Sequence, residues 1–398
     1  MIALMAPSPP DLAERLRALP AAGLLWSALP GAWIVGGAVR DLLLGSASSD
    51  LDVVIEGDAV EAARRLGEEL GGSVTVHDRF GTATVAADGH VYDLATARAE
   101  SYHEPGALPD VRPGTLAEDL RRRDFTVNAI AVALDGRTEA ADGAFEDLDA
   151  RRLRVLHDAS FRDDPTRLLR LVRYATRLGF AVEPATDALA HAAVAEGALA
   201  TVTPARIGGE LRLLLRECSA VEALARVAGW DLGVPLSLDA QVGERALALL
   251  PEDGRRDLLL LAVAVRSAPA AALFSWLDAL EFTARERDVV VAAAQAEGIE
   301  GDMERPSEIA ARLGGLPVEA VALAGALGAA EPARRWLGEL RHVRLDIDGD
   351  DLLAAGVPQG PALGRGLAAA LRAKLDGEAP DRAAQLAVAV ELCRSDPK

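Results

Sequence analysis

Length, composition and charge already exclude several classes of protein. The chain has 398 residues and is 50% hydrophobic, which is enough for two to four domains with buried cores, at about 100–200 residues each. Its net charge of -19 argues against a surface that binds nucleic acid all over, but arginines gathered between residues 121 and 177 leave room for a local basic cleft. The only cysteines, Cys218 and Cys393, are far apart, so neither a disulfide framework nor a cysteine zinc site is expected.

The sequence gives no sign of a membrane protein. The first ten residues, MIALMAPSPP, lack the basic and apolar segments of a signal peptide, and the longest later apolar run, 258–265, is too short to cross a bilayer. We therefore predict a cytoplasmic protein with no membrane partner.

Residues 31–134 contain six strand-like runs and one clear helix. The helix is predicted over 58–70, and the strand-like runs are 32–37, 51–56, 73–78, 81–87, 90–95 and 125–134. From about residue 150 the β-branched runs become rare, and Ala/Leu/Arg-rich helical periods continue to the C-terminus. We predict an α+β chain in which a mixed sheet with flanking helices is followed by an all-helical region.

The segment GGAVRD, residues 36–41, lies between a strand-like and a helix-like run. A helix N-terminus offers free backbone N–H groups and a favourable dipole to an anion. Gly36 and Gly37 would let the backbone approach a phosphate, and Arg40 would bind it in a bidentate fashion. A tight turn without a ligand would use the same two glycines, so the motif alone leaves the function open.

Asp50 and Asp52 stand at the start of a strand-like run. Side chains at i and i+2 of a strand point to the same side, and two hard oxygen ligands on one face suit Mg²⁺. Asp93, in a later strand-like run, would add a third carboxylate and complete a two-metal arrangement for phosphoryl transfer. With 61 acidic residues in the chain, such a pair is equally what a solvated end of a strand would show.

Four blocks carry a resemblance to a known family. They are GGAVRDLLLG (36–45), SDLDVVI (49–55), EDLRRRDFTVNAIA (118–131) and DDPTRLLRLVRYATRLGF (163–180). In order and spacing they resemble the signatures of class II tRNA nucleotidyltransferases and bacterial poly(A) polymerases; PARIGGELRLLL (204–215) is similar to a further family segment. The resemblance implies a nucleotidyltransferase head over 1–140, a helical neck over 141–215, a helical body over 216–335 and a helical tail over 336–398.

The fourth block predicts a helix that begins at Asp163, Asp164 and Pro165 and ends at Gly179. Asp164 and Arg167 offer an acceptor beside donors, which matches the Watson–Crick edges of cytosine and adenine but not those of guanine and uracil. The resemblance implies that this pair selects CTP and ATP without a nucleic-acid template. Arg167, Arg170, Arg173 and Arg177 recur at three or four residues and are expected to share one helix face. The resemblance implies that Arg170 and Arg173 lie near the triphosphate, and that Arg123 in the third block contacts the nucleotide.

The segment 93–123 resembles the flexible loop of the family at full length. Because shortened loops mark relatives that add only CC, this length favours a CCA-adding or A-adding enzyme. We interpret Asn128, in the third block, as a structural residue.

These observations together predict a Mg²⁺-dependent enzyme that adds CMP and AMP, from CTP and ATP, to the 3' end of tRNA and releases pyrophosphate. Asp50 and Asp52 would hold the metal, with Asp93 as the third catalytic acid. The expected partner is tRNA, through its 3' end and acceptor arm, and the oligomeric state is left open. An A-adding or CC-adding sibling, a poly(A) polymerase and a catalytically silent RNA-binding homologue remain alternatives.

Overall fold

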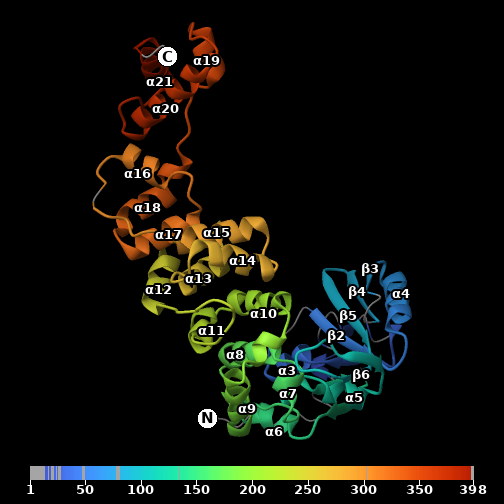
Figure 1. The fold of residues 1–398 in the computed structure, drawn as a ribbon. Coiled ribbons are helices and arrows are strands. Elements are labelled where there is room, and N and C mark those ends of the chain that lie inside the picture. Colours follow the sequence, from blue (N-terminus) through green and yellow to red (C-terminus); the bar gives the residue numbers. More distant parts are fainter. Residues whose placement is uncertain are drawn as a thin grey trace. The chain divides into compact units, whose positions relative to one another are not determined.

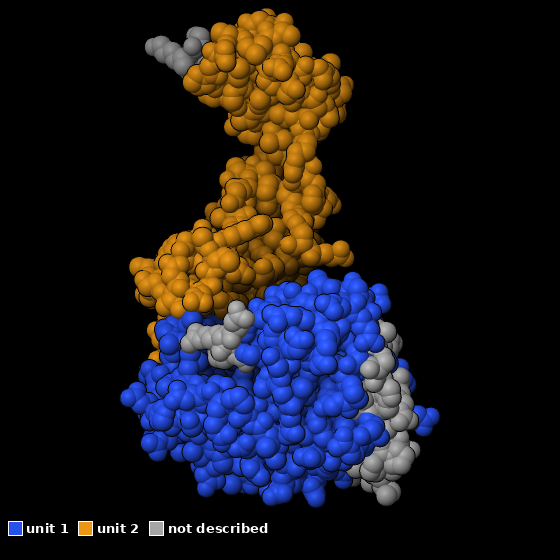
Figure 2. All heavy atoms as spheres, turned by 90° about the vertical axis from the view of Figure 1, so that its right-hand side faces the viewer, with its two compact units in different colours: residues 1–210 blue, residues 211–398 orange. Residues whose placement is uncertain are grey.

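The computed structural model describes residues 28–46, 50–77, 81–133, 135–301 and 303–395, together with a few positions between 14 and 25. The chain forms two compact units, Met1–Glu210 and Leu211–Lys398, which Figure 2 colours separately. The first unit contains the strands, whereas the elements of the second unit that the structure describes are all helical (Figure 1). The predicted α+β class is confirmed; the division into head, neck, body and tail stays a prediction.

The first unit is built on a seven-stranded mixed sheet with the order β3-β4-β5-β2-β1-β8-β9. Strand β2 pairs parallel with β5 and antiparallel with β1, so it lies inside the sheet. The bounds are β1 (Trp33–Val35), β2 (Asp50–Ile55), β3 (Ser73–His77), β4 (Thr82–Ala87), β5 (His90–Thr96), β8 (Ile130–Ala133) and β9 (Thr138–Ala140).

Helix α4 (Ala59–Leu70) packs against β3, β4 and β5, as Figure 1 shows. Asp58 caps its N-terminus by accepting hydrogen bonds from the backbone N–H groups of Val60 and Glu61, and Gly71 ends it in the left-handed conformation. Its bounds agree with the helix predicted over 58–70, because the capping residue and the spacing of the apolar residues can both be read from the local sequence.

The remaining elements of the first unit surround the sheet or follow it. They are α3 (Gly37–Leu43), α5 (Leu116–Arg121), η2 (Thr126–Asn128), α6 (Ala144–Asp149), α7 (Ser160–Asp163), α8 (Thr166–Leu178), α9 (Pro184–Ala195), η3 (Ala198–Thr201) and the start of α10 (Pro204–Arg216), with the strand pair β10 (Arg152–Leu153) and β11 (Ala181–Val182).

The segment 93–123 differs from the flexible loop that the resemblance implies. Strand β6 (Arg98–Ser101) pairs antiparallel with β7 (Asp110–Pro113), and helix α5 follows them. Thr115 and Glu118 form a capping box at the start of α5, so this helix has a defined first turn. Only the tip between the two strands, residues 102–109, is irregular in structure. We call β6, this tip and β7 the hairpin.

The second unit consists of short helices packed through alanine and leucine side chains. They are α11 (Ala220–Val227), α12 (Ala240–Leu249), α13 (Arg256–Ala264), α14 (Ala270–Ala279), α15 (Ala284–Ala294), α16 (Pro306–Leu313), α17 (Val318–Leu327), α18 (Ala330–Gly338), η4 (Leu340–His342), α19 (Gly349–Ala354), α20 (Pro361–Leu375) and α21 (Arg382–Ser395). Across the described ranges, no single helix has the length and apolarity to cross a membrane; α16 and α17 reach that mark only as a pair, and the pair is bent by 114°.

Candidate active site

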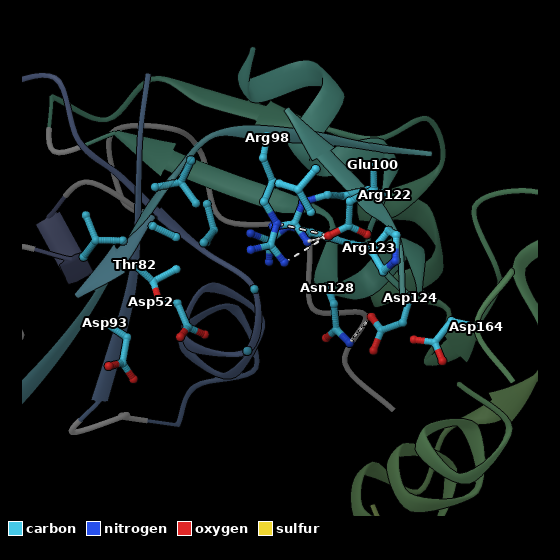
Figure 3. Close-up of a pocket in the computed structure, with 18 of the residues that line it drawn as sticks. Asp52, Thr82, Asp93, Arg98, Glu100, Arg122, Arg123, Asp124, Asn128 and Asp164 are labelled. Atoms are coloured by element: carbon cyan, nitrogen blue, oxygen red, sulfur yellow. Dashed lines mark hydrogen bonds and ion pairs between the residues drawn. The ribbon is translucent and has the colours of Figure 1, made fainter. Parts of the chain in front are cut away.

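A cavity of about 660 Å³ lies in the first unit between the sheet, the hairpin and helix α8. In Figure 3, Asp52 and Asp93 lie close together, and Asp164 lies across the cavity from them. Most of the predicted site residues line this cavity, namely Gly36, Gly37, Asp52, Asp93, Arg123, Asp164, Arg167 and Arg170. Segments that are far apart in the chain therefore meet at one site.

The sheet register brings two of the predicted acids side by side. In the parallel pair β2 and β5, Asp52 is the register partner of Asp93, at the usual strand spacing of about 4.8 Å. Their neighbours Leu51 and Leu94 are buried, whereas both aspartates are exposed, as strand alternation requires. Oδ1 of Asp93 accepts a hydrogen bond of 2.6 Å from the hydroxyl of Thr84 on β4.

This pair of carboxylates fits a magnesium ion by its chemistry, because both ligands are hard oxygens on one face of the sheet. Asp50 is the first residue of β2 and the register partner of Val91; its side chain lies outside the described part of the structure. Among the side chains that the structure describes, no group of three or more His, Cys, Asp or Glu residues forms a ready-made metal cluster. The roles of Asp50, Asp52 and Asp93 therefore stay predictions.

The turn between β1 and α3 comes very close to the acids. Gly36 has φ 71° and ψ -135°, a conformation that side chains rarely adopt. A Cβ atom at this position would lie 2.9 Å from Nη1 of Arg123 and 3.5 Å from Oδ2 of Asp52. Glycine is thus required here both by the backbone and by the close approach of two cavity side chains.

Arg40 is placed differently from its predicted phosphate-binding position. Its side chain is only 2% exposed and does not line the cavity. Nη1 donates to Oδ1 of Asn128 at 2.6 Å, and Nε donates to Oδ1 of Asp41 at 2.8 Å. Asn128 in turn donates to Asp124 and also lines the cavity, so its structural role stays a prediction. Protein acceptors hold its guanidinium in this structure, and the direct binding of a phosphate by Arg40 stays a prediction.

Asp119 on α5 organises the arginines of the third block. It is fully buried and accepts hydrogen bonds from Nη2 of Arg122 at 2.7 Å and Nη2 of Arg123 at 2.9 Å. Burial raises the pKa of this carboxyl, but the charges of the two arginines outweigh burial and lower the pKa below its ordinary value. Nε of Arg123 is buried and has no hydrogen-bond partner among the described residues, while the residue itself lines the cavity.

Helix α8 presents only part of its arginine series to the cavity. Arg167, Arg170 and Tyr174 line it, whereas Arg173 does not. At 3.6 residues per turn, Tyr174 returns to within about 20° of the direction of Arg167, but Arg173 is turned away by about 120°. Arg173 lies beside Arg170 instead, since both guanidiniums contact Glu210 on α10, at 3.6 Å and 3.2 Å, and its role near the triphosphate stays a prediction.

An ion pair between partly exposed Arg170 and buried Asp124 joins α8 to the third block. Nη2 of Arg170 donates to Oδ2 of Asp124 at 2.6 Å, and Nη1 reaches Glu210 at 3.2 Å. Burial raises the pKa of Asp124, but the charge of Arg170 and hydrogen bonds from Asn128, Arg170 and Phe125 outweigh it and lower the pKa to about 2. The Asp124 carboxylate is thus charged at neutral pH and holds Arg170 at the edge of the cavity.

The predicted base-selecting pair lies at the start of α8. Oδ1 of Asp164 accepts hydrogen bonds from the backbone N–H and the hydroxyl of Thr166. Arg167 donates from Nη1 to Ser160 and from Nη2 to the carbonyl of Arg122. Two of the five N–H bonds of this guanidinium are used in these contacts, so donors remain for a base at the cavity wall.

Several cavity residues were not found by sequence reasoning. Glu100 on β6 accepts hydrogen bonds from Arg98 and Arg122 and from the hydroxyl of Tyr102 (Figure 3). Burial, followed by the charge of Glu100, raises the pKa of Tyr102. The hairpin therefore forms a wall of the cavity; its strands, 98–101 (RAES) and 110–113 (DVRP), carry no strand-like pattern in the sequence.

The first unit is a mixed-sheet head whose cavity is lined by acids and arginines, and comparisons with known proteins identify its family. Residues 32–154 match the family described as Poly A polymerase head domain. The chain is 34% identical to the A-adding tRNA nucleotidyltransferase of Geobacter sulfurreducens over 91% of this chain, but it spans only 45% of that relative. It is 37% identical to the CC-adding tRNA nucleotidyltransferase of Deinococcus radiodurans, over 84% of this chain and 82% of the relative.

The similarity extends to a solved structure. The Thermotoga maritima CCA-adding enzyme complexed with tRNA_CCA is 26% identical and superposes with a TM-score of 0.76, covering 98% of each chain. The chain belongs to the tRNA nucleotidyltransferase family, which confirms the resemblance found in the sequence.

Proposed function

We propose that this chain adds nucleotides to the 3' end of tRNA, using CTP and ATP and releasing pyrophosphate. The observation that carries the proposal is the single cavity in which Asp52 and Asp93 stand across from Asp164 and Arg167. One wall offers carboxylates to phosphate-bound metal, and the other offers a pair that matches the edge of a base. The names and bound molecules of the relatives, which include A-adding, CC-adding and CCA-adding enzymes, support the same reaction class.

Base selection follows from the acceptor Asp164 and the donors of Arg167, which lie at the start of α8. Asp164 accepts from the exocyclic amino group of cytosine or adenine, and Arg167 donates to the neighbouring ring nitrogen. Guanine and uracil present a carbonyl oxygen where Asp164 requires a donor, so two acceptors would face each other without a proton. The pair thus excludes GTP and UTP by leaving buried polar groups unpaired.

In this proposal the phosphates bind at the turn between β1 and α3 and at Arg123 of the third block. Gly36 and Gly37 expose the backbone at the start of α3, and Arg123, which lines the same cavity, offers its positive charge to an anionic ligand. Arg40 contributes indirectly in this proposal, because it holds Asn128 and Asp41 beneath the turn. The turn at Gly36 lies next to both Arg123 and Asp52, so the positive groups and the acids meet at the same place.

Magnesium is the proposed cofactor, held by Asp50 and Asp52 with Asp93 beside them. When bound, the ion neutralises charge on the reacting phosphate and the departing pyrophosphate. The residues of the chain itself position the nucleotide against the tRNA 3'-hydroxyl and exclude the wrong bases, which is catalysis by orientation and charge.

The decisive experiment incubates the protein with three tRNA substrates, which lack CCA, end in C, or end in CC, each with labelled CTP or ATP. Completion of all three to CCA supports the full activity. Addition of A to the CC substrate alone identifies an A-adding enzyme, and addition that stops at CC identifies a CC-adding one. Long A tails identify a poly(A) polymerase, and tRNA binding without any product overturns the proposal in favour of a silent RNA-binding protein.

A further inference from the structure

Arg206 on α10 joins two parts of the site that are far apart in sequence. Its Nη2 donates to Oδ1 of Asp164 at 2.8 Å, 42 residues away, and its Nη1 donates to the backbone carbonyl of Gly106 at 2.8 Å, 100 residues away. Asp164 is the residue proposed to read the base, and Gly106 is at the tip of the hairpin. One guanidinium therefore bridges the base reader and a cavity wall.

The contact with Arg206 completes the anchoring of one carboxylate oxygen. Oδ1 of Asp164 accepts hydrogen bonds from Thr166 N at 3.0 Å, Thr166 Oγ1 at 2.6 Å and Arg206. Among the described residues, Oδ2 of Asp164 accepts none. Since Oδ1 is held from three sides, the plane of the carboxylate is fixed, and with it the direction in which Oδ2 faces a ligand.

The hairpin tip is seated closely on the helical part of the first unit. Gly106 has φ +72°, and a Cβ atom there would lie 2.2 Å from Oγ1 of Thr201 and 2.9 Å from its carbonyl oxygen. The N–H of Gly106 donates to the carbonyl of Arg162 at 3.2 Å. Only a glycine fits this position, so the tip docks through its backbone on α7, η3 and α10.

We propose that Arg206 is a positioning residue that couples docking of the hairpin tip to the orientation of the Asp164 carboxylate, and thereby sets nucleotide selectivity. This inference rests on the proposed function. Arg206 does not line the cavity itself; it acts through Asp164. A planar guanidinium holds two acceptors in a fixed relation, whereas a lysine ammonium does not impose that geometry.

The test compares Arg206→Gln and Arg206→Lys with wild type in the full chain. The ratio of correct to incorrect nucleotide incorporation, CTP and ATP against UTP and GTP, is measured as a ratio of kcat/KM values. We expect Arg206→Gln to lower this selectivity about tenfold or more, the effect of losing a charge-assisted hydrogen bond, with the loss mainly in KM. We expect Arg206→Lys to recover less than half of that loss on a logarithmic scale. Arg216→Gln, the same change at the exposed end of the same helix, serves as the matched control.

A second readout does not depend on activity. Hydrogen exchange of the backbone N–H groups of the hairpin tip, residues 102–109, reports how often the tip leaves its seat. We expect Arg206→Gln and Gly106→Ala each to accelerate this exchange about tenfold, and the double variant to lose no more nucleotide selectivity than the stronger single variant, because both changes break one coupling.

The outcomes separate the inference from the proposed function. Wild type that incorporates no nucleotide, while Arg206→Gln still accelerates hydrogen exchange of the hairpin tip, overturns the proposed function and the selectivity claim but leaves the docking contact standing. Wild-type selectivity in Arg206→Gln, or fully additive losses in the double variant, overturns the coupling. A fall in melting temperature with unchanged selectivity assigns Arg206 a structural role only and equally overturns it.

Discussion

The two adjacent glycines at positions 36 and 37 allow a sharp test, because the structure gives them opposite requirements. Gly36 has a positive φ, and its Cβ would lie 2.9 Å from Nη1 of Arg123. Gly37 is the first residue of α3, and its Cβ would lie 3.5 Å from Nη2 of Arg40, an ordinary contact. Gly36→Ala and Gly37→Ala are thus the same chemical change one residue apart, with different predicted results.

The expected magnitudes follow from these contacts. At Gly36 an alanine adopts a strained backbone, which costs about 1–3 kcal/mol, and it pushes on a guanidinium that Asp119 holds at 2.9 Å, which puts at risk a charge-assisted hydrogen bond of about 1.5–3 kcal/mol. We therefore expect Gly36→Ala to lower the local unfolding free energy by about 3 kcal/mol. At Gly37 the gain in helix propensity is about 1 kcal/mol at most, so the change in stability is small.

Hydrogen exchange of the β1 and β2 backbone, followed by mass spectrometry, measures the difference in local unfolding free energy between the two variants. A thermal unfolding curve of the whole two-unit chain would not isolate the change in the first unit. Nucleotide incorporation is measured in parallel and is expected to fall far more in Gly36→Ala. Equal exchange rates in the two variants, or greater loss in Gly37→Ala, would refute the reasoning from backbone conformation.

Three further changes address the acids of the site. Asp52→Asn should abolish incorporation and leave hydrogen exchange of the sheet unchanged, since the side chain is exposed; near-normal turnover would remove Asp52 from the metal site. The pKa of about 2 for Asp124 lies below its unfolded value, so its contribution of about 2–3 kcal/mol is present above pH 4 and is lost as the pH falls toward 2. Unfolding free energies of wild type and Asp124→Asn should accordingly converge on acidification, and a gap independent of pH would contradict the pairing with Arg170. Asp119→Asn should lower stability by about 3 kcal/mol and raise KM for the nucleotide by releasing Arg123; an unchanged KM would show that Arg123 needs no such support.

The sequence predicted those parts of the fold that depend on local pattern. Helix α4 and strands β2 and β5 were found within one or two residues, because capping residues and alternation are local. In the stretch predicted as one strand over 125–134, residues Thr126–Asn128 form a 3₁₀ turn instead. The buried Asn128 side chain, bonded to both Arg40 and Asp124, explains why this apolar run does not stay extended.

The site was only partly predictable for a related reason. The acids and glycines follow from short motifs, but the orientation of an arginine depends on partners elsewhere in the chain. Arg40 was expected to face a phosphate, yet Asn128 lies 88 residues away in sequence and takes its donor. Arg206 lay in a segment similar to the family, and no spacing rule links it to Gly106 or Asp164. Such contacts exist only once the chain has folded.

Helix α8 sets a limit on how this protein can change during evolution. Arg167, Arg170 and Tyr174 reach one cavity because the helix carries them at fixed angular steps, and Asp164 precedes the helix. A single inserted residue after Arg167 would turn everything beyond it by about 100°, so that Arg170 and Tyr174 would leave the wall together. We expect substitutions in this helix to be far better tolerated than insertions or deletions. The second unit follows α8 in the chain, so its helices can change in length without altering the directions in which α8 presents its side chains to the cavity.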